Sequence, residues 1–248
     1  MLRALYRSAS LRAAAALGLS GVAFALGNLI LARVLPSQEY GLVSLFIGVV
    51  AVCGVTAPLG LDVVVGRRGL RLDPRWRRAA LAASTAVGLA TAALAAVAYR
   101  LEIFLLACLL ITTIAAGLTQ SGTAYFQGQH RLGLAVWISQ LSNWQLVPVA
   151  LITALFRHVT AAAPCVLITG AGVIAASAVW LHIVRREAAA APQPDPGALF
   201  SEALSLVMIQ ASSAAFLQLE PRRLSVPHAS GRRPTHAHTR AAGSRQRG

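Results

Sequence analysis

The chain has 248 residues, of which 56% are hydrophobic and 12% charged, and its formal net charge is +14. The mean hydropathy of +0.65 is typical of proteins that cross a membrane several times, and it excludes an ordinary soluble domain. The positive charge does not indicate a nucleic-acid partner, because the arginines stand in short blocks between apolar runs and near the C-terminal end, as topology signals do. We therefore expect an integral membrane protein.

Six apolar runs are each long enough to cross a membrane as a helix. A helix rises about 1.5 Å per residue, so about 20 residues cross a hydrocarbon core of about 30 Å. Lipid offers no partner to a free backbone amide or carbonyl, and runs of this length must therefore be helical. The predicted fold is an all-α, polytopic helical bundle. Its six expected helices cover residues 13–32, 40–61, 79–99, 103–130 (strongly apolar up to 118), 132–156 and 159–184.

The C-terminal part of the chain differs from these runs. Residues 188–197 are rich in alanine and proline, and they predict a stiff linker after a six-helix lobe in residues 1–187. Residues 198–219 are mostly apolar but include Glu202. They are either a seventh transmembrane helix, which we favour, or an amphipathic helix on the membrane surface. Residues 220–248 are rich in arginine, histidine and proline and predict a disordered tail.

The distribution of arginine predicts the orientation of the helices. Arginines are concentrated in the N-terminal segment and in the connections that follow the second, fourth and sixth helices. Connections rich in arginine stay in the cytoplasm. The N-terminus and these three connections are therefore expected to be cytoplasmic. A seventh span would place the arginine-rich tail on the opposite side, against the same rule.

The first two runs carry a combination of motifs that resembles a known family. The corner between them reads Leu31-Ala-Arg-Val-Leu-Pro-Ser-Gln-Glu-Tyr-Gly41, and the second run ends with Pro58-Leu-Gly-Leu-Asp-Val-Val-Val-Gly-Arg67. Both are similar to signatures of the polysaccharide and O-antigen flippases, which belong to the multidrug/oligosaccharidyl-lipid/polysaccharide exporter superfamily. The segment Phe126-Gln-Gly-Gln-His-Arg131 is similar to a later loop of the same family.

The resemblance implies a transporter of the bacterial inner (plasma) membrane. Its cargo would be a lipid-linked oligosaccharide of the undecaprenyl-pyrophosphate type, moved from the cytoplasmic to the outer leaflet by alternating access. Members of the family consist of two lobes of helices around a central cavity. The resemblance covers one lobe and the start of a second, so we expect a copy truncated to the N-terminal lobe. The sequence does not indicate whether a partner lobe or a second copy completes it.

Polar residues in the fifth run are the first candidates for cargo contacts. Gln140 and Asn143 are three residues apart and can share one helix face, and Trp144 follows directly. Polar groups inside a membrane turn away from lipid, either to bond a neighbouring helix or to line a wet cavity. In the second case the amides would bind sugar hydroxyls, and Trp144 or Trp137 would stack on a sugar ring. Both interpretations remain open.

Arginines beside the first two runs are the second group of candidates. Arg67 and Arg68 follow the second run, where they could attract the pyrophosphate of the cargo or contact anionic membrane lipids. Arg33 closes the first run on the other side and either holds a phosphate or anchors the helix by reaching toward the headgroups.

No motif indicates catalysis. The sequence contains no nucleophile–base pair, metal-ligand spacing or glycine-rich phosphate loop, and its three cysteines lie singly in apolar runs. We therefore expect no enzymatic activity, no cofactor and no metal. Two alternatives to the flippase function remain: a drug or lipid exporter of the same superfamily, and a membrane fragment or assembly subunit that does not transport.

Overall fold

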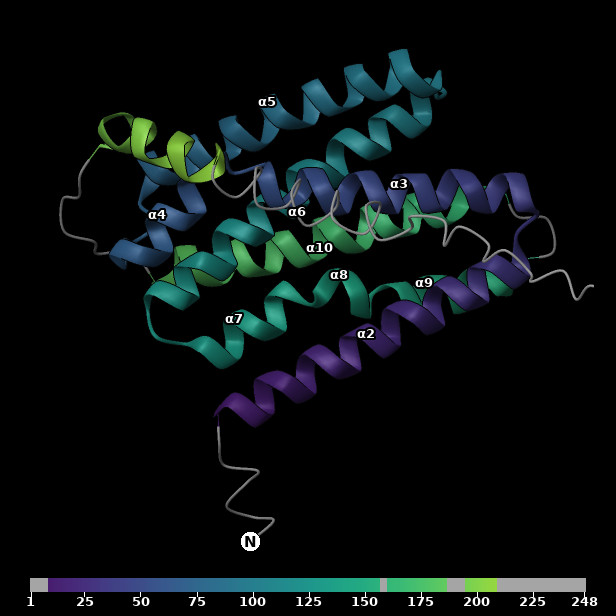
Figure 1. The fold of residues 1–248 in the computed structure, drawn as a ribbon, viewed down its shortest axis with the longest axis horizontal. Coiled ribbons are helices and arrows are strands. Elements are labelled where there is room, and N and C mark those ends of the chain that lie inside the picture. Colours follow the sequence, from purple (N-terminus) through teal and green to yellow (C-terminus); the bar gives the residue numbers. More distant parts are fainter. Residues whose placement is uncertain (1–8, 157–159, 187–194, 209–248) are drawn as a thin grey trace, which may run out of the picture. The chain divides into compact units, whose positions relative to one another are not determined.

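The structure is a computed structural model that describes residues 9–156, 160–186 and 195–208, all within one compact unit (Figure 1). Helices make up 87% of the described residues and none of these residues lies in a strand, so the predicted all-α class is confirmed. The labelled helices are α2 (Ala9–Val34), α3 (Ser37–Thr56), α4 (Leu61–Arg68), α5 (Pro74–Tyr99), α6 (Ile103–Gly128), α7 (Leu132–Ser139), α8 (Leu141–Trp144), α9 (Leu146–Ala154) and α10 (Ala162–Arg186). A further helix covers Pro196–Met208.

Within the described part of the chain, five helices are long and apolar enough to cross a membrane: α2 (over Ala13–Val34), α3, α5, α6 and α10. Their outward faces carry apolar side chains, and Val97 and Ile103 are each 83% exposed. Apolar surface of this extent is unfavourable in water and favourable in lipid. The protein is therefore a polytopic membrane protein.

Helix α6 is the centre of the bundle. It packs against α3, α4, α5, α7 and α10, while α2 packs mainly against α9 (Figure 1). Small residues allow these close contacts: a Cβ added to Gly117 of α6 would lie 2.4 Å from Ser84 Oγ of α5. Without a hydrophobic driving force between helices in lipid, such backbone approach supplies much of the packing energy.

The second expected helix ends earlier than its apolar length predicts. Helix α3 stops at Thr56, and the chain turns through Pro58 before α4 begins at Leu61. Proline cannot donate a helical hydrogen bond, and Leu59 and Gly60 adopt left-handed backbone conformations with φ of +50° and +76°. The turn separates a spanning helix from a short helix that leads into the arginine-rich connection.

The fifth expected helix, residues 132–156, is not continuous. Three short helices, α7, α8 and α9, replace it and run along α2 (Figure 1). Pro148 contributes to the interruption because it cannot donate to the carbonyl of Trp144. Apolar length alone predicted one helix, and the interruption places backbone ends and polar side chains inside the bundle.

The helix Pro196–Met208 packs beside α4 (Figure 1). Its Ala203 is fully buried, and its Glu202 forms a salt bridge with Arg68 of α4 at 2.5 Å. The helix includes the last two residues of the predicted linker, Pro196 and Gly197. Most of that linker and residues 209–248, with half of the proposed seventh helix and the predicted disordered tail, lie outside the described residues.

Candidate binding cavity at a broken helix

Two apolar clusters fill the inside of the bundle, and a cavity touches both; we call it the polar cavity because seven polar residues interrupt its largely apolar wall. The first cluster includes Leu146 and Ile168, and Leu141 packs against the second. The cavity has a volume of about 180 Å³, and these three residues form part of its wall. Its polar lining comes from α6 and from the segment around α8: Thr112, Thr119, Gln120, Ser139, Ser142, Asn143 and Gln145.

The interruptions in the helix explain why so many polar groups meet here. Gln140 lies between α7 and α8 with φ −96° and ψ 0°. Its backbone N–H donates to the carbonyl oxygens of Val136 and Trp137. Helix α8 is a single turn, and Gln145 joins it to α9. Irregular backbone at membrane depth is tolerated only inside protein or along a wet cavity. The broken helix lies along the cavity, with Gln140, Asn143 and Gln145 half-buried and Ser139 and Ser142 exposed.

A hydrogen-bonded network centres on Gln140. Its Oε1 accepts from Ser20 Oγ of α2 at 2.6 Å and from Asn143 Nδ2 at 3.0 Å, and its Nε2 donates to Ser139 Oγ at 3.2 Å. The predicted shared face of Gln140 and Asn143 is confirmed. Gln140 itself holds the break against α2 and does not line the cavity, whereas Asn143 does.

The tryptophans lie beside the cavity, not in its wall. Trp144 stacks on Trp137 with ring centroids 5.8 Å apart and an interplanar angle of 25°. Trp144 Nε1 is buried and has no hydrogen-bond partner within the part of the chain that the structure describes. The exposed ring of Trp137 faces away from the core. The ring of Trp144 thus stacks on the indole of Trp137, whereas stacking on a sugar ring was one interpretation of the sequence.

Two residues of α6 in the cavity wall, Thr112 and Gln120, were not identified from the sequence, and each lies close to a polar side chain outside the wall. Thr112 and Thr169 share a hydroxyl–hydroxyl hydrogen bond of 2.8 Å between α6 and α10. Gln120 Nε2 lies 3.5 Å from Asp62 Oδ2, the outer limit of a hydrogen bond. Asp62 is only 5% exposed, and this burial raises the pKa of its carboxyl, while a backbone hydrogen bond from Val63 opposes the shift. The polar second half of α6 was the available sequence signal.

The candidate arginines do not line this cavity. Arg67 and Arg68 lie exposed in the last turn of α4, where Arg68 is engaged by Glu202. Arg33 lies exposed in the last turn of α2. The structure thus brings Gln140, Asn143 and Trp144 together and keeps the three arginines apart from them.

The fold and the cavity together define a class, a polytopic all-α membrane protein with a polar cavity at a broken helix. No protein-family model, curated protein or solved structure matches the chain.

Proposed function

We propose that this bundle is a transporter unit that moves a lipid-linked oligosaccharide of the undecaprenyl-pyrophosphate type across the bacterial inner membrane. The observation that supports the proposal is the cavity at the break between α7 and α9, whose largely apolar wall includes seven uncharged polar residues. Interrupted helices near the middle of the membrane are where transporters commonly bind their cargo.

The polar residues of the lining support a contact with a sugar. Asn143 and Gln145 offer amide donors and acceptors, and Ser142 and Thr119 offer hydroxyls. None of the cavity-lining residues is charged. Drug-sized ligands occupy pockets of about 300–1,000 Å³, and at about 180 Å³ this cavity takes only part of a large cargo. We assign it the contact with one sugar unit.

The pyrophosphate of the cargo is assigned to the arginine-rich end. Arg67 is exposed beside Arg68, whose charge Glu202 partly neutralises, so Arg67 is the freer cation for a phosphate. In the proposed orientation this end and the N-terminus face the cytoplasm. The cargo would enter there and leave toward the outer leaflet.

Binding of a fluorescent lipid-linked oligosaccharide to the purified full chain tests the proposal. Asn143→Leu is expected to weaken binding about tenfold, because it removes a cavity amide that bonds a sugar hydroxyl. Asn28→Leu is the matched control, since Asn28 also lies in a span but donates to Phe24 O of its own helix. Equal effects of both variants would contradict the proposed site.

A second measurement separates the cargo classes. Proteoliposomes that contain the wild-type chain are expected to protect the labelled glycan from a membrane-impermeant quencher as it crosses the bilayer. An apolar cationic dye is the comparison cargo. Transport or binding of the dye without the glycan would overturn the assignment and support a drug exporter.

A further inference from the structure

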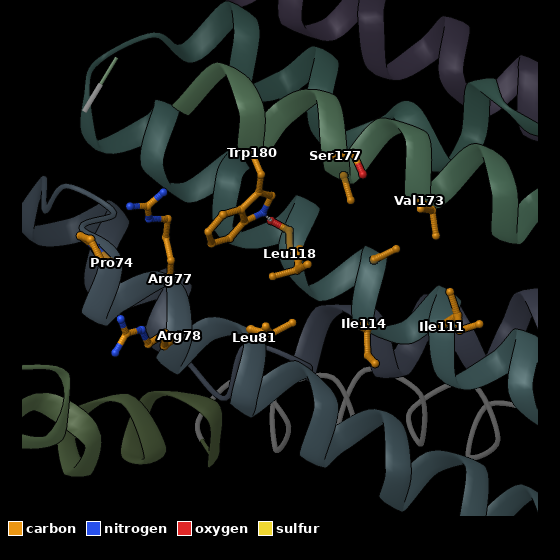
Figure 2. A pocket seen from close by; sticks show the side chains of 12 residues that line it. Pro74, Arg77, Arg78, Leu81, Ile111, Ile114, Leu118, Val173, Ser177 and Trp180 are labelled. Atoms are coloured by element: carbon orange, nitrogen blue, oxygen red, sulfur yellow. Dashed lines mark hydrogen bonds between the residues drawn. The ribbon is translucent and has the colours of Figure 1, made fainter. Parts of the chain in front are cut away.

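A second and larger hollow lies on the other side of α6 from the polar cavity. It has a volume of about 560 Å³ and is formed by α5, α6 and α10 (Figure 2). Its wall shares no residue with the polar cavity. Apolar side chains predominate in it, among them Leu81, Ile111, Ile114, Leu118, Val173 and Trp180.

This larger hollow, which we call the groove, opens to the outside of the bundle. Leu81, Ile111 and Val173 are 48%, 45% and 39% exposed, so their side chains are accessible from the lipid side. Trp180 holds α10 to α6 at the groove by donating its indole N–H to Leu118 O at 2.9 Å. A molecule of the surrounding bilayer can therefore enter sideways without passing through the protein core.

Two arginines stand at one end of this apolar groove. Figure 2 shows the guanidinium groups of Arg77 and Arg78 beside Pro74, with the apolar side chains extending away from them along the wall. Arg77 Nε is buried and has no hydrogen-bond partner among the described residues. The nearby carboxylate of Asp73 accepts from the backbone amides of Arg75 and Trp76 at 2.8 and 3.0 Å. Arg77 as a whole is half-buried and Arg78 is exposed, so their positive charge at the end of the groove is accessible to an anion from the lipid side.

We propose that the groove is a binding site for an anionic phospholipid of the bilayer. Its phosphate accepts from Arg77 and is attracted by Arg78, and one acyl chain lies along the apolar wall of α6 and α10. Basic pockets between transmembrane helices select anionic headgroups in this way. The volume of about 560 Å³ lies within the usual range of about 300–1,000 Å³ for sites that bury a small amphiphile. The ligand is a resident lipid and not the transported cargo, so the proposal stands without the proposed function.

Native mass spectrometry of the purified full chain with added lipid tests the site. Phosphatidylglycerol and phosphatidylcholine with identical acyl chains are the probes. Two arginines are expected to favour phosphatidylglycerol about thirtyfold, and Arg77→Gln combined with Arg78→Gln reduces this preference to near unity. The matched control is Arg185→Gln combined with Arg186→Gln, which removes the same charge from the last turn of α10, outside the groove. If both double variants lost the preference for phosphatidylglycerol equally, the preference would reflect net charge in general, and the proposed site would be overturned.

A second variant tests the acyl chain separately. Ser177→Trp fills the groove from α10, whereas Ala178→Trp adds the same bulk at the next position, which is exposed and does not line the groove. Ser177→Trp is expected to weaken phosphatidylglycerol binding, and Ala178→Trp to leave it unchanged. Unchanged lipid binding by Ser177→Trp would show that the acyl chain does not lie in the groove, and would overturn the proposal. Equal competition by soluble glycerol phosphate would show a phosphate site that does not recognise lipid, and would also overturn the proposal.

Discussion

Ser20 and Gln140 are 120 residues apart in the chain, and their side chains form a 2.6 Å hydrogen bond. Ser20 is 2% exposed and lies on the continuous helix α2, whereas Gln140 lies at the first interruption of the broken helix. The bond fixes the position of the break relative to α2. Because Gln140 also accepts from Asn143, it connects the outer helix to the wall of the polar cavity.

Ser20→Ala is expected to destabilise the protein by about 1 kcal/mol, the order of a hydrogen bond between helices in a membrane. The change leaves Asn143 as the remaining donor to Gln140 Oε1. Thermal unfolding in detergent measures the loss. Thr85→Ala is the control, since Thr85 bonds only to Leu81 O of its own helix at an exposed position. A loss in Ser20→Ala no larger than in the control would contradict the structural role of the bond.

Asp62 predicts a pH dependence of stability. Burial raises the pKa of its carboxyl above the ordinary value of 3.8, so the folded state binds this proton more tightly than the unfolded state. Stability is then greatest at low pH and falls as pH rises through the window between 3.8 and the raised value.

Asp62→Asn removes the penalty of burying this charge while keeping the shape of the side chain. Its melting temperature is expected to exceed that of the wild type at about pH 8, and the difference is expected to vanish toward about pH 4. Glu102→Gln removes an exposed carboxylate at the start of α6 and reports the effect of charge loss alone. A difference that grows as the pH falls would have the opposite sign and would contradict the burial of Asp62.

Gly60 is expected to tolerate no side chain. Its φ is +76°, and a Cβ at this position would lie 2.2 Å from Ala203 O. The left-handed conformation alone costs an alanine about 1–2 kcal/mol. The clash adds to this cost and moves the helix Pro196–Met208 away from α4. Gly60→Ala is therefore expected to make that helix sensitive to limited proteolysis.

Gly48→Ala provides the comparison for Gly60, because a Cβ at Gly48 of α3 meets nothing within 4 Å. Alanine favours a helix over glycine by about 1 kcal/mol, so this variant is expected to be as stable as the wild type or slightly more stable. The same proteolysis pattern in both variants would show that close packing at Gly60 does not hold the helix.

The salt bridge between Arg68 and Glu202 is expected to contribute little. Their side chains are 47% and 37% exposed, and exposed ion pairs contribute at most about 1 kcal/mol. Glu202→Gln should therefore destabilise the protein less than Gly60→Ala, and added salt should reduce the difference from the wild type. A larger, salt-independent loss in thermal unfolding would indicate that Glu202 has a structural role beyond this pair.

Of the site residues predicted from local patterns, only Asn143 lies in the wall of the candidate cavity. Helical spacing placed Gln140 beside Asn143, because residues three apart share a face. Ser20 was not predictable as their partner, since the contact depends on how α2 packs against a segment far along the chain. Trp144 was expected to face a sugar, and the structure instead stacks it on Trp137, a neighbour on the same broken helix.

The sequence by itself determined that this is an all-α membrane protein, and five of its six predicted spans correspond to the long apolar helices α2, α3, α5, α6 and α10. Lipid excludes other backbone structures, so apolar length is sufficient for that prediction. Only the tertiary structure decided that α3 ends at Thr56, that the fifth run is broken, and that Arg77 meets an apolar groove built by three helices. Turns, polar networks and grooves depend on contacts between residues distant in the chain, and hydrophobic length carries no information about those contacts.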